Sequence, residues 1–430
     1  MHPASDRGKV PGSTLRPLEG KRICLVFEHS LSHYGRLLLE IEALQLAGAT
    51  VQLVTQHPIP DGPADVPRVY APLGPHTPLV RSIGWSSHTW MLLRRADNLL
   101  RKPARILAAW WTSRVNQARY SRTLQMLGSD VDLFWVIDFP RLGAVIASAR
   151  VSGARVVYET VDLVPEYVYY GEQHRQKCLD DERRLIGDID GFITASDSYA
   201  DYYVEFYGLD RLGRRPVVRD NMPRRIASEI VPTTPPLRFL FLGSLMFDRP
   251  VLELIEAVAE AKTDMTLTFR GKNHLDVASA RRVADRIAQL GLQGRVEILD
   301  PCPPGALVAT AREHDVGIVA LRGADENERR ASTGKLFTYM AAGLAVLGSD
   351  LPGIARIVHA HDNGMLVDGV DPHAWAVAFD RLGSLPPASI DLMKERSLGA
   401  ANHYAWDKQE AAFVGEFVRA LSGQSHRMHP

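Results

Sequence analysis

Short apolar runs alternate with amphipathic stretches along most of this chain. Each run has the length of a strand, and each is followed by a turn and by apolar residues three or four positions apart, which is the period of a helix. This alternation is typical of parallel sheets whose connections are helices, so we predict an α/β fold. The runs that we interpret as strands are 22–27, 51–55, 133–137, 155–158, 191–194, 239–242, 265–269, 296–299, 316–320, 345–347 and 364–367.

A proline-rich stretch divides these strands into two series. Residues 230–236 carry Pro232, Pro235 and Pro236, a composition typical of a linker. Each series has roughly six strands, enough for a doubly wound, Rossmann-like parallel sheet, and ligands of such sheets bind beyond the carboxyl ends of the strands. We therefore predict two domains that face a central cleft. The predicted division is a disordered lead-in at 1–20, an N-terminal domain at 21–228, a linker at 229–236, a C-terminal domain at 237–403 and a helix at 404–422 that packs back across the domains.

Composition narrows the function classes. The chain has 430 residues, 46% of them hydrophobic, which suffices for two cores. Lys and Arg number 50, as do Asp and Glu, and no recognisable nucleic-acid-binding motif is present, so a nucleic-acid partner is not expected. Three distant cysteines argue against a disulfide framework or a zinc site. Since no signal peptide or long apolar run is found, we expect a cytoplasmic protein.

A small-residue turn and a lysine open one of the predicted helices. Residues 332–334 are Ser, Thr and Gly, and Lys335 follows at the start of a short apolar stretch. The first N–H groups of a helix have no partner inside it, and they carry a partial positive charge. Such a start, with an ammonium beside it, can bind a phosphate oxygen. The alternative is an ordinary capped helix that buries Leu336 in a core.

A second phosphate contact is predicted where the first strand of the C-terminal series ends. Gly243 follows this strand, and Arg249 comes shortly afterwards, near the start of a predicted helix. Glycine allows a ligand to approach the backbone, and arginine provides a planar, permanent charge. Both residues also occur at such places without a ligand, so the prediction depends on Arg249 and Lys335 meeting at one cleft.

Several motifs together resemble retaining GT-B glycosyltransferases of family 4. In the C-terminal half they are Gly243 followed by Arg249, Asp300-Pro-Cys-Pro-Pro304, Asp315-Val-Gly-Ile-Val319 and Lys335-Leu-Phe-Thr-Tyr-Met-Ala-Ala-Gly343. In the N-terminal half, residues 157–166, 193–196 and 219–223 are similar to segments of the exopolysaccharide-type members. The resemblance covers about residues 20–422 and implies two Rossmann-like domains, a nucleotide-sugar donor in the C-terminal one and an acceptor in the N-terminal one.

The resemblance also implies roles for individual residues. The family positions that match Arg249 and Lys335 bind the donor diphosphate and stabilise the charge that develops as the nucleotide leaves. Two fixed cations and helix-end amides can do so without a metal, so neither a metal nor another cofactor is expected. The donor-binding set that we predict is Gly243, Ser244, Arg249, Gly271, Lys272, Asn327, Gly334, Lys335, Leu336 and Thr338.

Four positions depart from the family pattern. Where the family often has two glutamates, this chain has Arg330 and Thr338, and where it often has histidines in the N-terminal domain, this chain has Ile137 and Val161. Three carboxylates stand near the replaced histidines and can take over substrate hydrogen bonds or a proton. With Arg249 and Lys335, these candidate catalytic residues are Asp138, Glu159 and Asp162. The alternative is that each carboxylate is solvated or caps a turn.

Residues 78–124 form a basic and aromatic insertion. Nine Arg and Lys side chains are set among four tryptophans, with Asp97 as the acidic residue. Cations and interfacial aromatic rings on helices suit an anionic membrane surface, so we predict peripheral contact with the inner face of the cell membrane. The alternative is that the tryptophans fill the core while the arginines face water.

The function that the sequence predicts is transfer of a sugar from a nucleotide-diphosphate donor to a hydroxyl acceptor. Retention of configuration is what the family resemblance implies. The acceptor is a glycan, a lipid-linked molecule or a small molecule, and the setting is polysaccharide or glycoconjugate biosynthesis. Two alternatives remain: a non-catalytic partner protein of GT-B fold, which the four departures would explain, and a nucleotide-sugar epimerase, which would need acid and base groups on both sides of a sugar carbon.

Overall fold

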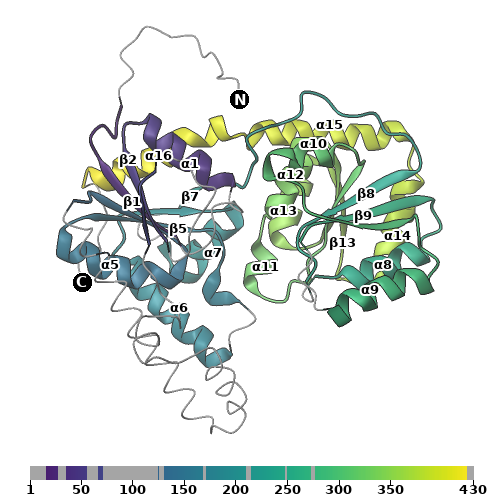
Figure 1. Cartoon of the computed structure of the whole chain (residues 1–430), viewed down its shortest axis with the longest axis horizontal. Helices are drawn as coiled ribbons and strands as arrows, with labels where there is room; N and C mark the ends of the chain where they lie inside the picture. Colours follow the sequence, from purple (N-terminus) through teal and green to yellow (C-terminus); the bar gives the residue numbers. More distant parts are fainter. Residues whose placement is uncertain are drawn as a thin grey trace, which may run out of the picture.

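A computed structural model describes residues 16–27, 35–55, 66–70, 124, 130–167, 171–209, 215–246, 249–272 and 277–423. Within these residues the chain forms two α/β domains side by side (Figure 1). Most of the predicted lead-in, and the insertion 78–124 apart from Leu124, lie outside the described residues, so their predictions stay predictions.

The N-terminal domain is built on one parallel sheet of seven strands in the order β3-β2-β1-β4-β5-β6-β7. Five of these strands match the runs named from the sequence. The other two, β3 and β7, have three and two residues, too few to show any periodicity. The strands are β1 (Arg22–Phe27), β2 (Thr50–Thr55), β3 (Arg68–Tyr70), β4 (Leu133–Ile137), β5 (Arg155–Thr160), β6 (Gly191–Thr194) and β7 (Val217–Val218).

Helices connect these strands, and local capping sets where some of them begin and end. Helix α7 starts after Ser196, whose hydroxyl accepts a hydrogen bond from the Tyr199 amide (3.1 Å), and it stops at Gly208, where φ is 69°. The helical segments of this domain are α1 (Gly35–Leu46), the 3₁₀ turn η2 (Phe139–Arg141), α5 (Leu142–Ser152), the 3₁₀ turn η3 (Val164–Glu166), α6 (Glu172–Ile186) and α7 (Asp197–Tyr207).

The C-terminal domain is built on a second parallel sheet, of six strands in the order β10-β9-β8-β11-β12-β13. Its strands are β8 (Leu237–Leu242), β9 (Met265–Arg270), β10 (Val296–Leu299), β11 (Val316–Val319), β12 (Ala345–Ser349) and β13 (Gly364–Val367). Its helical segments are α8 (Val251–Glu260), α9 (Val277–Gln289), η5 (Pro304–Ala306), α10 (Leu307–Ala311), α11 (Glu326–Arg330), α12 (Gly334–Ala342), α13 (Pro352–His361) and α14 (Pro372–Gly383).

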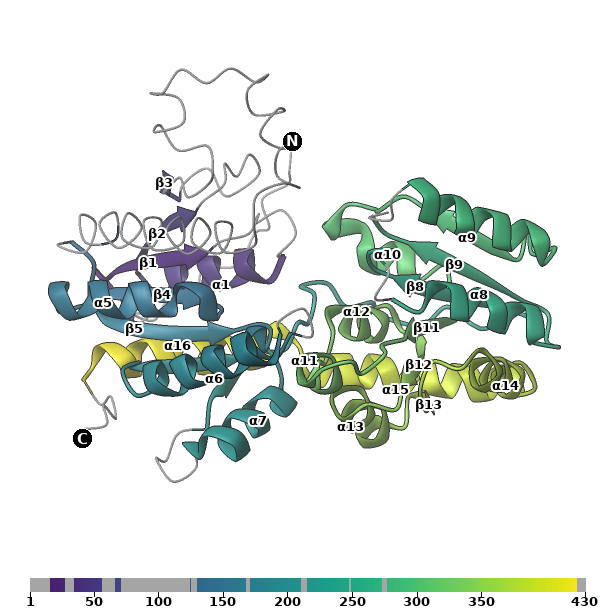
Figure 2. The same cartoon turned by 90° about the horizontal axis from the view of Figure 1, so that it is seen from below.

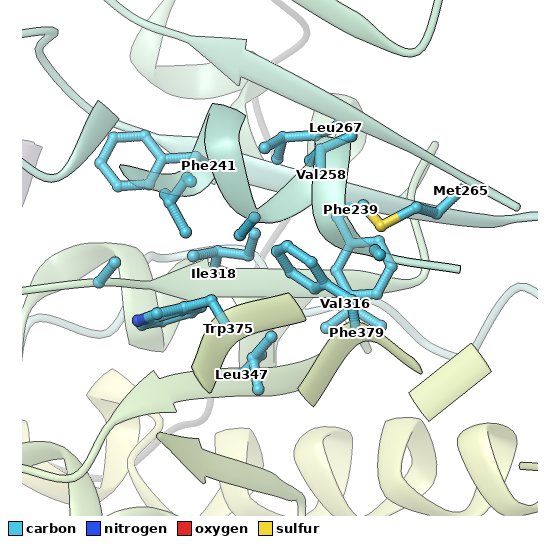
Figure 3. Close-up of a cluster of buried hydrophobic side chains, with 14 of the residues drawn as sticks. Phe239, Phe241, Val258, Met265, Leu267, Val316, Ile318, Leu347, Trp375 and Phe379 are labelled. Atoms are coloured by element: carbon cyan, nitrogen blue, oxygen red, sulfur yellow. The ribbon is translucent and has the colours of Figure 1, made fainter. Parts of the chain in front are cut away.

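Side chains from one face of this second sheet meet helices α8 and α14 in a dry core (Figure 3). Phe239 of β8 lies against Phe379 of α14, with ring centroids 4.9 Å apart. Burying an aromatic or branched side chain of this size stabilises a fold by about 1.5–3 kcal/mol. This packing fixes the positions of the strands, so the loops at the carboxyl ends of the strands are held at defined places.

The last two helices join the domains (Figure 1). Helix α15 (Pro387–His403) packs on α12 and β12 of the C-terminal domain, whereas α16 (Trp406–Leu421) packs on β5, β6 and β7 of the N-terminal sheet. Phe413 and Phe417 of α16 lie edge-on to Trp135, with ring centroids 5.8 and 5.5 Å away. The end of the chain is thus part of the N-terminal core. None of the helices in the described ranges has the length and apolar character needed to cross a bilayer.

Candidate functional site

The turn after β8 lies against the turn after β9. The Gly243 amide donates to the Arg270 carbonyl (3.0 Å), and the Leu245 amide donates to the Lys272 carbonyl (3.0 Å). Gly243 has a φ of 133°, which side-chain-bearing residues rarely adopt. Glycine is therefore required at this position by the backbone conformation itself.

Gly243, Gly271 and Lys335 converge at the carboxyl edge of the second sheet. A Cβ on Gly271 would lie 1.9 Å from the Gly243 carbonyl oxygen, so the two turns are in close contact. A Cβ on Gly243 would lie 3.4 Å from the Lys335 ammonium nitrogen, which also sits 4.8 Å from the centre of the Phe241 ring. The structure thus places a cation directly beside a bare backbone turn.

Helix α12 is fixed in this position by Tyr339. Its hydroxyl accepts a hydrogen bond from the Leu242 amide (2.7 Å) and donates to the Ile318 carbonyl (3.1 Å), so it links the helix to two strands. Lys335, in the first turn of this helix, lies beside the turn after β8. There, the buried hydroxyl of Thr333 has no hydrogen-bond partner among the described residues. Such a helix start is suited to an anion.

Arg249 reaches the same region from the start of α8. Its guanidinium forms a 3.1 Å ion pair with Glu328 of α11, and 27% of the Arg249 side chain is exposed. The second Glu328 oxygen accepts a hydrogen bond from the Ala324 amide (3.2 Å). The structure therefore gives both predicted cations a place at the edge formed by the second sheet, with Arg249 held by a carboxylate.

The remaining predicted donor residues differ in what they present. Ser244 and Gly334 are half-buried and Lys272 is exposed. The Leu336 side chain is fully buried in a core, so only its backbone can face a ligand. The Thr338 hydroxyl donates to the Gly334 carbonyl (2.9 Å), within its own helix.

Asn327 lies between the two domains. Its side-chain oxygen accepts hydrogen bonds from the Leu163 amide (2.8 Å) and from the Tyr199 hydroxyl (2.7 Å), both in the N-terminal domain. Arg330, one of the departures from the family pattern, also faces that domain, because it pairs with Glu205 of α7 (3.1 Å). These side chains connect the domains, which sequence reasoning did not foresee.

Asp138 and Asp162 lie together at the carboxyl edge of the N-terminal sheet. Asp138 has an unusual φ of 61°, and its carboxylate accepts hydrogen bonds from the amides of Val161 (2.9 Å) and Asp162 (3.3 Å). Burial raises the pKa of Asp138 to about 8, and the negative charge of Asp162 contributes to the rise. Asp162 itself accepts a hydrogen bond from the Tyr167 hydroxyl (3.0 Å). Asp138 can therefore hold a proton at neutral pH.

Glu159 is fully enclosed, so it braces the N-terminal domain and presents no surface to a ligand. One carboxylate oxygen pairs with Arg36, and the other accepts a hydrogen bond from the Trp135 indole (2.8 Å). Arg36 also pairs with Glu40 (3.0 Å). Burial raises the pKa of Glu159 to about 7, Glu40 adds to the rise, and Arg36 opposes it.

A second buried arginine completes this network. The Arg219 guanidinium lies 3.0 Å from Glu40 and 4.4 Å from the centre of the Trp406 ring, and burial lowers its pKa to about 10. Sequence reasoning missed Arg36 and Arg219. The signal for Arg36 was a charge beside three leucines at the start of an apolar helix, and Arg219 stands in a segment that matched the family.

Comparison with known proteins relates part of the C-terminal domain to one protein family. Residues 236–384 match the family of group 1 glycosyl transferases. This segment holds Gly243, Arg249, Gly271 and Lys335, so the group 1 match covers the edge described above. D-inositol 3-phosphate glycosyltransferase of Corynebacterium glutamicum is 30% identical to this chain over 137 residues, which span 32% of the chain and 31% of that relative. The match thus covers about a third of the relative's length.

Solved structures extend the likeness to nearly the whole chain. Sucrose-phosphate synthase of Thermosynechococcus elongatus superimposes with a TM-score of 0.65 at 16% identity, covering 94% of this chain and 100% of that one. HepE of Anabaena, in complex with UDP and glucose, gives a TM-score of 0.62 at 13% identity, covering 93% of this chain and 99% of that one. The two Rossmann-like domains form the GT-B fold, as predicted. At sequence identities of 13–16%, these similarities support the fold alone.

Proposed function

We propose that this protein is a glycosyltransferase that moves a sugar from a nucleoside diphosphate donor to a hydroxyl acceptor, with retention of configuration. One observation carries the proposal. The Lys335 ammonium lies at the start of α12, beside the bare turn at Gly243, within the segment that matches group 1 glycosyl transferases. An anion at this place would meet a cation and backbone N–H groups together.

The proposed chemistry needs positive charge where the donor breaks. The bond between the anomeric carbon and the diphosphate oxygen is cleaved, and the electron pair leaves with the diphosphate. The acceptor hydroxyl oxygen bonds to the carbon and gives its proton to the departing diphosphate oxygen. Lys335 and Arg249 would stabilise the departing diphosphate, and they supply charge that a divalent cation would otherwise provide. Loss of one such contact typically costs about 10²–10³ in rate.

Gly243, Ser244, Gly334 and the backbone of Leu336 would form the wall against the phosphates, while Gly271 and Lys272 would border the base or the ribose. UDP is the first donor nucleotide to test, because HepE of similar fold is named as binding UDP. On the acceptor side, Asp138 and Asp162 are the carboxylates that the N-terminal edge offers. The place of the reaction in polysaccharide or glycoconjugate assembly, at the inner face of the membrane, remains part of the proposal.

The test measures thermal stabilisation by UDP, GDP, ADP, dTDP and CMP. At about 100 times its dissociation constant, a ligand stabilises the fold by about 2.7 kcal/mol, which a melting curve resolves. We expect one diphosphate to stabilise the wild type and to have no effect on the double variant Arg249→Ala/Lys335→Ala. Turnover of the matching nucleotide sugars then follows.

The matched control is Lys262→Ala/Arg281→Ala, which removes two exposed cations from the same domain. It should retain the full ligand response. If no nucleotide stabilises well-folded wild-type protein, the proposal is wrong and a non-catalytic partner protein is the better account. If a nucleotide binds but no sugar is transferred to any acceptor, including water, the partner protein is again favoured.

A further inference from the structure

The short helix α11 lies between the two domains and contacts both of them (Figure 2). Its side chains point in different directions. Glu328 faces the start of α8 in its own domain, whereas Asn327 faces η3 and α7 in the N-terminal domain. Adjacent residues of one helix turn thus connect a cation of the proposed donor site with the N-terminal domain.

The contact of Glu328 with Arg249 is rigidly built. One carboxylate oxygen pairs with the guanidinium at 3.1 Å, and the other accepts the Ala324 amide at 3.2 Å. The Glu328 amide in turn donates to the Asp325 carboxylate (2.8 Å), which caps the helix. With only 13% of its side chain exposed, Glu328 is held in one place and can hold Arg249 in one place.

A second ion pair connects the segment between β11 and α11 with α8. Arg322, at the start of the loop, pairs with Glu253 of α8 (2.7 Å). Arg249, just before α8, pairs with Glu328 of α11, whereas Arg322, just after β11, pairs with Glu253 of α8. The segment from β11 to α11 is therefore attached to the α8 region at two places. Two crossed pairs resist sliding of the loop better than one.

On the other side, Asn327 is held by the N-terminal domain. The Tyr199 hydroxyl donates to its side-chain oxygen at 2.7 Å, and the Leu163 amide donates to the same oxygen at 2.8 Å. Tyr199 is 2% exposed, so this contact lies in the interior of the protein. The position of α11 therefore depends on the N-terminal domain.

We propose that α11 is a positioning element that fixes the Arg249 guanidinium through Glu328 and that is itself fixed by the N-terminal domain through Asn327 and Tyr199. Glu328 is thus a positioning residue for diphosphate binding, and it acts through Arg249. This inference rests on the proposed function, because it assumes that Arg249 binds the diphosphate.

The first experiment measures dissociation constants of the full chain by calorimetry. The probes are the diphosphate of the above panel that the wild type binds most tightly and the corresponding nucleoside. Glu328→Gln keeps the shape but removes the charge that holds Arg249. We expect diphosphate binding to weaken about tenfold and nucleoside binding to stay within about twofold of wild type.

Glu326→Gln is the matched control, because it makes the same change on the same helix, where the carboxylate pairs with Arg329 and Arg330. It should bind diphosphate as the wild type does. In the Arg249→Ala background, Glu328→Gln should cause no further loss, because its effect passes through the guanidinium. Additive losses, or tighter diphosphate binding by Glu328→Gln, would overturn the positioning role.

The second experiment tests the link to the N-terminal domain. Tyr199→Phe removes the hydroxyl that holds Asn327, and it should weaken diphosphate binding about three- to fivefold but not in the Glu328→Gln background. Tyr203→Phe is its control on the same helix, since the Tyr203 hydroxyl is buried against Glu182 and away from α11. Equal effects of the two substitutions would overturn the link.

The outcomes separate this inference from the proposed function. If the wild type binds a diphosphate and Lys335→Ala abolishes binding, the proposed donor site is supported. The affinities of the Glu328→Gln and Tyr199→Phe variants then test the role of α11 by itself. If the wild type binds no diphosphate, both proposals fail.

Discussion

The carboxyl edges of the two sheets handle charge in opposite ways. At the C-terminal edge, glycines bare the backbone and Lys335 lies beside the turn at Gly243. At the N-terminal edge, carboxylates are drawn inward: Glu159 is fully buried against Arg36, and Asp138 is 8% exposed. The C-terminal edge thus presents positive charge, whereas the carboxylates of the N-terminal edge are buried.

This difference separates stability from ligand binding. A buried ion pair gains little over a well-packed apolar pair, but removing one partner leaves an uncompensated charge and is costly. A partly exposed cation can be removed cheaply, because water solvates what remains. Substitutions that unpair a buried charge at the N-terminal edge should therefore lower the free energy of unfolding, and substitutions at the C-terminal edge should weaken ligand binding.

The largest effect is expected for Arg36→Met. It removes the cation that pairs with both Glu40 and Glu159, and Arg219 then remains beside Glu40 while Glu159 loses its ion pair, so unfolding should become easier by about 3–5 kcal/mol at pH 7.5. The loss should shrink at pH 5, because Glu159, whose pKa is raised to about 7, then takes up a proton. Urea unfolding at both pH values measures it.

Arg150→Met is the control, because its partner is Asp188 and both side chains are at least one-third exposed. A change below about 1 kcal/mol is expected there. Equal losses in the two variants would mean that the network around Arg36 is no more important than a surface pair.

The next effect is on binding. In Gly271→Ala, the new methyl group would meet the Gly243 carbonyl, so the two turns must move apart. We expect diphosphate affinity to fall at least about tenfold, since one displaced contact of this kind costs about 1.4 kcal/mol or more. Gly399→Ala, in helix α15 with open space around it, should leave affinity unchanged and add about 0.5–1 kcal/mol of stability. Unchanged affinity in Gly271→Ala would remove this turn from the site.

A further effect, on the pH dependence of stability, concerns Asp138. The pKa of Asp138 is raised from 3.8 to about 8 in the folded state. Between these pH values the folded protein holds a proton on Asp138 that the unfolded chain releases, so the free energy of unfolding decreases as the pH rises from about 4 to about 8. The free energy of unfolding should therefore fall from pH 5 to pH 8. In Asp138→Asn it should fall less steeply, by up to about 1.4 kcal/mol per pH unit. Urea titrations at four pH values measure the slopes, and parallel slopes would place the proton elsewhere.

Prediction from the sequence succeeded where the information is local. Strand β1 has the predicted ends and helix α16 lies within the predicted range 404–422, because hydrophobic periodicity and turn residues sit next to one another in the chain. The strands β3 and β7 were missed because they are short pieces that a neighbouring strand stabilises. Asn327 was predicted to contact the donor, and its bonds to Leu163 and Tyr199 could not be foreseen, since these partners lie 164 and 128 residues away.

What the sequence by itself determined is the α/β class and most strands, because each follows from residues that are neighbours in the chain. Tertiary structure alone decided which charges are buried. Arg36 and Glu159, 123 residues apart, meet only after the sheet forms, and α16 completes a core that begins at β1. The placing of α11 between the domains was decided in the same way, because desolvation and ion pairing depend on neighbours in space.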